Sequence, residues 1–251
     1  MRETFRSRLR NHEPLVGTIL TLPCAAIAEI GVSAGLDWLF LDMEHGQLEY
    51  SDVARIIQAV GDATAIIVRV PEAREMWAKR ILDLGAAGLI FPQVKTAAEA
   101  QEFCSWCRYA PAGKRSVGIA RAQAYGARLS EYLASANDSI TVILQIEHAA
   151  AIAGLEQILA VPGIDALFLG PYDLSASYGI PGQVDHPLVR DAMNQFLSSC
   201  QRANMSRGIF VSNNAAARRS LDDGYSLLAV GMDAPLLRGS IVTAIDGLKT
   251  R

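Results

Sequence analysis

The sequence predicts an α/β protein built as a single (β/α)8 barrel over residues 1–251. Three observations lead to this expectation. Short apolar runs alternate eight times with segments of helical period, most of those runs end in polar or charged residues, and 251 residues is about the length that such a barrel needs. A doubly wound open sheet is the alternative, because it shares the alternation of strands and helices.

The apolar runs predict eight buried strands. In the run at 38–42, apolar residues lead directly into Asp42, with Glu44 and His45 close behind. A continuous apolar run, without alternation, suits a parallel strand that is covered on both faces. The predicted strands are residues 16–20, 38–42, 66–70, 88–91, 141–146, 166–169, 207–211 and 227–230.

Helical periodicity fills the segments between the strands. We expect Ser51 to cap one helix, and Thr96 with Glu99 to form a capping box at the start of another. Two long connections, 110–139 and 171–187, are expected to be functional loops. The predicted helices are residues 25–34, 51–60, 72–84, 96–109, 149–160, 186–204, 213–223 and 234–248.

Composition favours a small-molecule partner. The net charge of -3 and the pI of about 5.8 provide no general attraction to nucleic acid or to an anionic membrane. The basic start of the chain is not followed by an apolar signal segment, and no apolar run approaches the roughly 18 residues of a membrane span. Cys104 and Cys107 form a lone C-x-x-C in a predicted helix, where packing is a simpler role than metal or redox chemistry. We therefore expect a cytoplasmic protein.

Polar side chains follow most of the predicted strands, and in a closed parallel barrel all of these strand ends meet at one mouth. Glu147 and Asp173 follow adjacent strands, so their carboxylates repel unless a cation lies between them. With oxygen ligands only, Mg2+ or Mn2+ suits such a site better than zinc. Two solvated strand ends are the alternative. The polar residues at the strand ends are Asp42, Glu44, His45, Arg69, Gln93, Gln145, Glu147, Asp173 and Asp233.

Arg69 lies within an apolar run, so its charge needs an anionic partner. That partner is either a neighbouring carboxylate, which is a structural role, or a substrate carboxylate or oxyanion. The turn at 170–175 could also present the backbone N–H groups of Tyr172 and Asp173 to a bound carboxylate.

Five segments, in order along the chain, resemble the HpcH/HpaI aldolase family. They are LDMEHG at 41–46, VRVP at 68–71, FPQV at 91–94, QIE at 145–147 and GPYDLS at 170–175. The resemblance implies a metal-dependent class II pyruvate aldolase, like 4-hydroxy-2-oxoheptanedioate aldolase, that cleaves 4-hydroxy-2-oxo acids to pyruvate and an aldehyde. It also implies a homo-oligomer, a hexamer in this family.

The resemblance assigns the binding residues. Glu147 and Asp173 are expected to bind the divalent metal, Mg2+ or Mn2+, with Co2+ as a further candidate. Gln145 and the backbone of Tyr172 and Asp173 are expected to hold the pyruvate moiety. Members of the family commonly have a small residue at the position of Tyr172, and this departure leaves the preferred aldehyde open.

The resemblance also assigns the catalytic residues. Arg69 is expected to stabilise the enolate, and His45 to act as the base. Asp83 matches an aspartate that a neighbouring subunit supplies to raise the basicity of the histidine. From the residues alone, Asp83 is an ordinary helix residue and Asp42 is the better partner for His45.

Other classes remain open. A class I aldolase needs a lysine on a strand to form a Schiff base, but Lys79, Lys95, Lys114 and Lys249 all lie outside the predicted strands. A barrel lyase that acts on a CoA thioester, or an enolpyruvate carbon–carbon ligase, is the second enzyme reading. A non-enzymatic ligand-binding barrel is the third.

Overall fold

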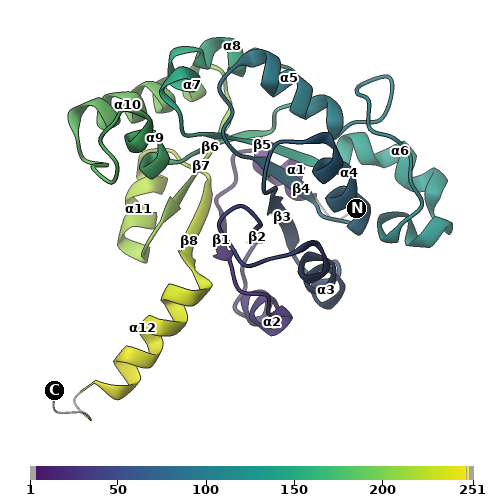
Figure 1. The fold of residues 1–251 in the computed structure, drawn as a ribbon, viewed down its shortest axis with the longest axis horizontal. Coiled ribbons are helices and arrows are strands. Elements are labelled where there is room, and N and C mark those ends of the chain that lie inside the picture. Colours follow the sequence, from purple (N-terminus) through teal and green to yellow (C-terminus); the bar gives the residue numbers. More distant parts are fainter. Residues whose placement is uncertain (1–3, 247, 249–251) are drawn as a thin grey trace.

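The computed structural model describes residues 4–246 and 248, and these form a closed barrel of eight parallel strands paired in sequence order (Figure 1). The barrel, rather than the open sheet, is therefore confirmed. The strands are β1 Leu15–Leu20, β2 Trp38–Asp42, β3 Ala65–Arg69, β4 Gly88–Phe91, β5 Thr141–Ile146, β6 Ala166–Leu169, β7 Ser206–Val211 and β8 Leu227–Met232.

The helices lie around the barrel and agree closely with the periodic segments. The helices of the described residues are α1 Phe5–Arg10, α2 Ala25–Ser33, α3 Tyr50–Val60, α4 Glu75–Leu84, α5 Ala97–Trp106, the 3-10 helix η1 Arg121–Gly126, α6 Leu129–Ser139, α7 Ala149–Ala153, α8 Leu155–Leu159, α9 Pro171–Ser177, α10 Pro187–Arg202, α11 Asn214–Asp222 and α12 Asp233–Ile245.

Several helix boundaries differ from the prediction for local reasons. Glu49, and not Ser51, caps α3, because its side chain and that of Asp52 form a reciprocal capping box. The predicted helix at 149–160 is divided at Gly154 into α7 and α8. The predicted helix at 234–248 ends at Ile245, and residue 247 lies outside the described residues. The capping box of Thr96 and Glu99 is confirmed at α5.

The two connections expected to be loops are partly helical. The segment 110–139 contains η1 and α6, and the segment 171–187 contains α9. Helix α1 was also not predicted. Helices α1, η1 and α9 escape a search for long periodic patterns, since a helix of six or seven residues completes at most two turns. Helix α6 has 11 residues, and the prediction missed it as part of a long connection.

Alternate residues of each strand fill the barrel interior. Trp38 and Phe40 on β2 face inward together with Ile67 on β3, Ile143 on β5 and Phe168 on β6. The ring of Phe40 lies edge-on to that of Phe168, with 5.8 Å between the ring centroids. Because side chains alternate along a strand, the next inward positions after these apolar layers are at the carboxyl ends of the strands.

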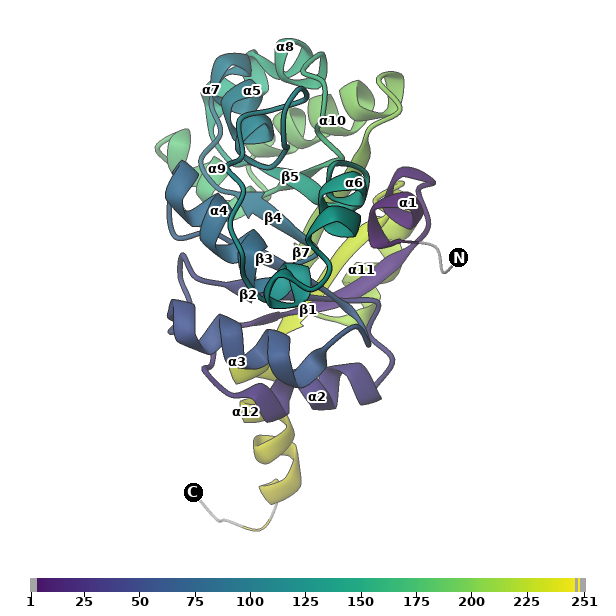
Figure 2. The ribbon, with the colours of Figure 1, turned by 90° about the vertical axis from the view of Figure 1, so that its right-hand side faces the viewer.

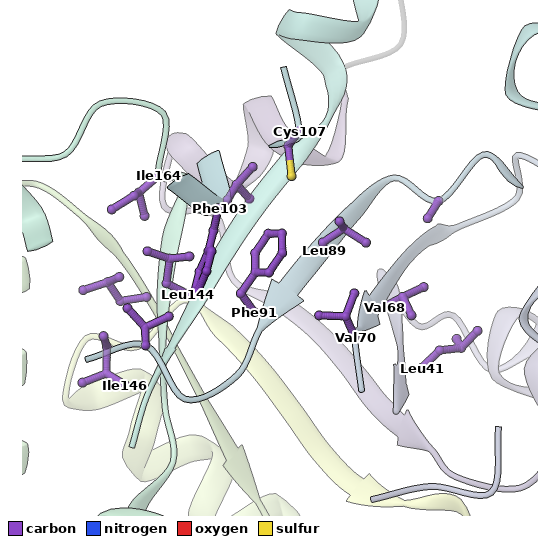
Figure 3. Packing of buried hydrophobic residues seen from close by; sticks show 14 of the residues in the cluster. Leu41, Val68, Val70, Leu89, Phe91, Phe103, Cys107, Leu144, Ile146 and Ile164 are labelled. Atoms are coloured by element: carbon purple, nitrogen blue, oxygen red, sulfur yellow. The ribbon is translucent and has the colours of Figure 1, made fainter. Parts of the chain in front are cut away.

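A second apolar layer separates the strands from the helices. Figure 3 shows part of it, where Phe91 of β4 packs beside Phe103 of α5 at a centroid distance of 5.0 Å. Cys104 and Cys107 are buried in this layer, and burial raises the pKa of each thiol to about 12. The expectation that these cysteines serve packing is therefore confirmed, because an un-ionised buried thiol is a poor nucleophile and metal ligand.

Helix α12 differs from the other helices, since it projects away from the barrel in both views (Figures 1 and 2). Within residues 4–246 and 248, no helix has the length and apolar character that crossing a lipid bilayer requires.

Candidate active site

Three polar residues form the uppermost inward layer of the barrel. Asp42 follows Trp38 and Phe40 at the same alternation, Arg69 follows Ile67, and Gln145 follows Ile143. The register places Asp42 beside Arg69 across β2 and β3. The inward-facing positions of the strands, which are apolar in the core, are thus charged or polar at the carboxyl end of the barrel. Enzymes with a (β/α)8 barrel hold their active sites at this end.

Asp42 holds the Arg69 guanidinium through two parallel hydrogen bonds. Arg69 Nε donates to Asp42 Oδ1 at 2.9 Å, and Nη2 donates to Oδ2 at 2.7 Å. Both side chains are buried. Burial alone would lower the pKa of Arg69, but the hydrogen bond and charge of Asp42 outweigh it and raise the pKa overall. The guanidinium is therefore a fixed cation.

This pairing gives Arg69 and Asp42 a structural role in each other's burial. Arg69 has the neighbouring carboxylate that its burial requires, and Asp42 is engaged with Arg69 instead of with the imidazole of His45. The residue-based expectation of an Asp42–His45 pair is therefore wrong for the side chains. Asp42 Oδ1 does accept the backbone N–H of His45 at 3.2 Å, which fixes the turn after β2.

The remaining nitrogen of Arg69 points toward other polar groups of the mouth. Nη1 donates to Gln145 Oε1 at 3.3 Å and lies 3.2 Å from Glu44 Oε2. That Glu44 oxygen is buried and has no hydrogen-bond partner among the described residues. Burial raises the pKa of Glu44, Arg69 opposes the rise, and the charges of Asp42 and Asp173 add to it.

Glu147 is the most strongly perturbed acid of the mouth. It is only 2% exposed, its Oε1 accepts the backbone N–H of Gln93 at 2.7 Å, and its Oε2 accepts the side-chain amide of Gln145. Burial, partly offset by the Gln93 bond, raises the pKa of Glu147 to about 7, and the nearby charges of Glu44 and Asp173 contribute to the rise. Glu147 therefore carries a proton over much of the range below neutral pH in the absence of a cation.

Gly170 makes room for the Glu147 carboxylate. A Cβ at this position would lie 2.9 Å from Glu147 Oε2, which is closer than ordinary van der Waals contact. Gly170 directly precedes α9, and Tyr172 and Asp173 are the second and third residues of that helix. Backbone N–H groups in the first turn of a helix have no acceptor within the helix. They are therefore available to a substrate carboxylate, as expected for Tyr172 and Asp173. The Tyr172 side chain is 62% exposed.

His45 lies in the turn after β2 with its side chain 62% exposed, so it is free to contact a ligand in the mouth. Its Nε2 is 3.8 Å from Glu44 Oε2, and Glu44 is therefore the carboxylate nearest to the imidazole that the structure records.

Asp83 lies apart from the other candidate residues within one chain. It is in the last turn of α4, shortly before β4 begins, and thus toward the amino-terminal end of the barrel. Its Oδ1 accepts a hydrogen bond at 2.7 Å from Arg115, whose side chain is fully buried. In the described part of the chain, Asp83 pairs with Arg115 and forms no hydrogen bond or ion pair with His45.

The chemistry of the donor set fits a hard divalent cation. Glu147 and Asp173 are close enough for their charges to interact, and Glu44 adds a third carboxylate, whose Oε2 lies 3.2 Å from Arg69 Nη1. In the described part of the chain, no three His, Cys, Asp or Glu side chains come together as a complete ligand set. Mg2+ is commonly held by one or two carboxylates, with water and substrate oxygens completing its coordination, so the pair fits that ion.

Two contributors to this site were not assigned a role from the sequence. Glu44 was recognised only as one of several strand-end residues. Its position two residues after Asp42 was the available signal, since it continues the inward alternation of β2. Gly170 was visible as a glycine at a strand end, but its contact with Glu147 depends on the packing of β5 against β6.

The closed barrel and the acidic mouth around a fixed guanidinium define the protein as a (β/α)8-barrel enzyme. The sequence profile of the HpcH/HpaI aldolase/citrate lyase family matches residues 19–239. The chain is 39% identical over 237 residues to hydroxypyruvate/pyruvate aldolase from Paraburkholderia phytofirmans, covering 91% of each protein. It is 37% identical over 235 residues to 2-keto-3-deoxy-L-rhamnonate aldolase from Escherichia coli K12, covering 92% of this chain and 88% of the relative.

A solved structure agrees with these relatives. The crystal structure of an HpcH/HpaI aldolase/citrate lyase family protein from Burkholderia cenocepacia J2315 superposes with a TM-score of 0.93 at 38% identity, covering 98% of each chain. The chain belongs to the HpcH/HpaI aldolase/citrate lyase family. The relatives are named as aldolases, which are lyases that cleave carbon–carbon bonds, and the family resemblance drawn from the sequence is confirmed.

Proposed function

We propose that the protein is a divalent-cation-dependent aldolase that cleaves and forms 4-hydroxy-2-oxo acids, with pyruvate and an aldehyde as the products of cleavage. The observation that carries this proposal is the buried Glu147, whose raised pKa reflects burial and the neighbouring carboxylates, in the same mouth as a fixed Arg69. A cation offsets the repulsion among the acids, and a guanidinium stabilises a developing oxyanion.

The binding roles follow from the donors present. Glu147 and Asp173 would hold Mg2+ or Mn2+, with Co2+ as a further candidate. Gln145 and the first-turn N–H groups of Tyr172 and Asp173 would hold the carboxylate and keto oxygens of the 2-oxo acid. When bound, the cation supplies Lewis-acid stabilisation of negative charge on the substrate oxygens.

The side chains of the mouth would carry out the proton and charge steps. His45 accepts the proton of the C4 hydroxyl, and the C3–C4 bond breaks with its electron pair passing into the enolate of pyruvate. Arg69 stabilises the enolate oxygen while the aldehyde leaves. Protonation at C3 then gives pyruvate, and the reverse sequence is aldol addition. Asp83 of a second subunit would orient the imidazole and raise its basicity.

Tyr172 bears on the choice of aldehyde. The exposed Tyr172 stands at the entrance where the distal part of a hydroxy-oxo acid would lie.

Incubation of the protein with pyruvate, Mn2+ and a panel of aldehydes, with mass analysis of the products, tests the proposal. We expect aldol adducts that correspond to addition of one pyruvate. Absence of adducts across the panel, or turnover of a CoA thioester instead, would contradict it.

Binding of a divalent cation is expected to depend on pH around neutrality. Because the folded-state pKa of Glu147 is raised to about 7, protons compete with the cation below that pH, and the apparent affinity should fall by up to about tenfold per pH unit. The rise in melting temperature caused by a fixed subsaturating Mn2+ concentration should therefore be larger at pH 8 than at pH 6. Equal rises at both values would show that Glu147 is not a ligand.

We further propose that the protein is a cytoplasmic homo-oligomer in which a second copy covers α12. Apolar residues occupy several faces of this helix, and Leu237 and Ile241 are 53% and 52% exposed. An exposed helix that is apolar around much of its circumference needs to be buried by other protein. A second copy is the natural partner, since the helix that follows the last strand of a barrel ordinarily packs on the barrel, and α12 projects away from it (Figures 1 and 2).

Charge introduced on α12 is expected to dissociate the assembly. We predict that Leu237→Glu with Ile241→Glu lowers the molecular mass measured by sedimentation, because two carboxylates cannot be buried without partners. Turnover should fall as well, since the proposed Asp83 contact crosses subunits. Asn194→Glu, on an exposed position of α10, is the control and should leave the mass unchanged. A monomeric wild-type protein, or a double variant of unchanged mass, would contradict the proposal.

A further inference from the structure

A cavity of about 390 Å3 lies at the end of the barrel opposite to the acidic mouth. It is bounded by the segment between α1 and β1, the carboxyl-terminal ends of α10 and α11, and the starts of β7 and β8. His12, Asn204 and Arg207 contribute polar side chains to its wall. A volume of this size matches a small-molecule site.

Arg207 supplies a cation that lacks an acidic partner. Gly208 packs against the inward-facing ring of Phe168, so Arg207, one residue earlier, faces outward from the barrel into the cavity wall. Its Nε is buried without a hydrogen bond, and no carboxylate within residues 4–246 and 248 forms an ion pair with its guanidinium. A half-buried guanidinium without a counter-ion is unfavourable unless an anion reaches it.

The surrounding helix ends carry only partial negative charge, and two of their carbonyls already accept backbone hydrogen bonds. The carbonyl of Leu221, at the end of α11, accepts the N–H of Gly224, and the carbonyl of Cys200 in α10 accepts the N–H of Met205. Among the described residues that line the cavity there is no aspartate or glutamate, although Asp223 adjoins it in sequence. The guanidinium packs against Gly224, where a Cβ would collide with Nη2.

Two hydroxyl groups behind the wall are sealed from solvent, so a ligand in the cavity does not reach them. Tyr225 and Ser226 are 3% and 5% exposed, and in each the hydroxyl oxygen has no hydrogen bond among the described residues. On the opposite wall, His12 adopts a left-handed backbone conformation with φ of 57°, and its ring contacts Ser206 Oγ and Asn204 Oδ1, each at 3.1 Å. Both ring nitrogens of His12 are thus engaged within the protein.

We propose that this cavity is a second binding site, for a small organic acid or phosphate ester whose oxyanion pairs with the Arg207 guanidinium. The ligand is anionic because the lining carries one unpaired cation and no acid. It is small because the cavity holds only a few hundred cubic ångströms. The site lies at the far end of the barrel from Glu147, and its existence does not depend on the proposed aldolase reaction.

Isothermal titration of the protein with inorganic phosphate and with succinate, in chloride buffer of constant ionic strength, tests the site. We expect saturable binding of one anion per chain to the wild type. Arg207→Gln should weaken it by roughly tenfold or more, since a charge-assisted pair is lost. Arg219→Gln, an exposed arginine on α11 outside the cavity, should bind as the wild type does.

An Arg69→Gln variant separates this cavity from the acidic mouth. Retained binding in that variant places the anion at Arg207, and tighter binding of phosphate than of succinate, or the reverse, identifies the preferred oxyanion. Circular dichroism confirms that Arg207→Gln is folded. Lack of saturable binding of either anion, unchanged binding in a folded Arg207→Gln, or loss of binding in Arg69→Gln would overturn the proposal.

Discussion

Replacing Arg69 with lysine is expected to lower the turnover of aldol cleavage by about 100- to 1,000-fold. Lysine keeps the positive charge but loses the planar fork that forms two parallel bonds with Asp42 and leaves Nη1 directed toward Gln145. An ammonium would have to satisfy Asp42 and the substrate oxyanion with one nitrogen. Initial rates at saturating 2-oxo acid and cation measure this effect.

A matched control is available on the surface of the same protein. Arg55 pairs with Asp52 on α3, and Arg55→Lys also exchanges the guanidinium of an Arg–Asp pair for an ammonium. We expect turnover of this variant to remain within about twofold of the wild type, because surface pairs contribute little. Near-normal turnover of Arg69→Lys, with its fold intact by circular dichroism, would show that Arg69 has only a structural role.

Removal of the divalent cation is expected to abolish turnover, and addition of Mn2+ or Mg2+ to restore it. Glu147→Gln should remain inactive in the presence of added cation, with a loss of about three orders of magnitude, since Lewis-acid stabilisation is worth several kcal/mol. The loss of one carboxylate from the Glu147–Asp173 pair weakens cation binding directly. Rates after dialysis against EDTA, and after readdition of each metal, provide the measurement.

Glu156→Gln is the control for this substitution. Glu156 lies on the surface of α8, where it pairs with Arg202, and it belongs to no part of the mouth. This variant should respond to chelation and metal readdition as the wild type does. Full activity of the wild type after thorough chelation would refute the proposed cation requirement.

Strand positions could be predicted closely because they depend on local sequence. A buried parallel strand must be apolar on both faces, and runs such as 38–42 and 141–146 show this directly, so their ends agree with β2 and β5. Alternation along the strands also predicts which strand-end residues turn inward. Short helices such as α1 and α9 have no such signal, and their formation depends on packing against the completed barrel.

The interactions within the site could be predicted only in part. The convergence of Glu147, Asp173 and Arg69 follows from closure of the barrel, which brings all strand ends together. The pairing of Asp42 with Arg69 instead of His45 depends on the register of β2 against β3, and sequence does not specify that register. The location of Asp83 could not be predicted from the strand ends either, because Asp83 lies in the last turn of helix α4, toward the opposite end of the barrel.

Exchange of the methyl protons of pyruvate in deuterated water tests the central claim most directly, since it reports enolate formation without requiring the right aldehyde. With Mg2+ present, we expect the protein to accelerate loss of the methyl proton signal in nuclear magnetic resonance spectra, and we expect Arg69→Lys or chelation to suppress that acceleration. A rate of exchange that is the same with and without the protein, at saturating pyruvate and Mg2+, would contradict an enolate-forming site at the mouth of this barrel.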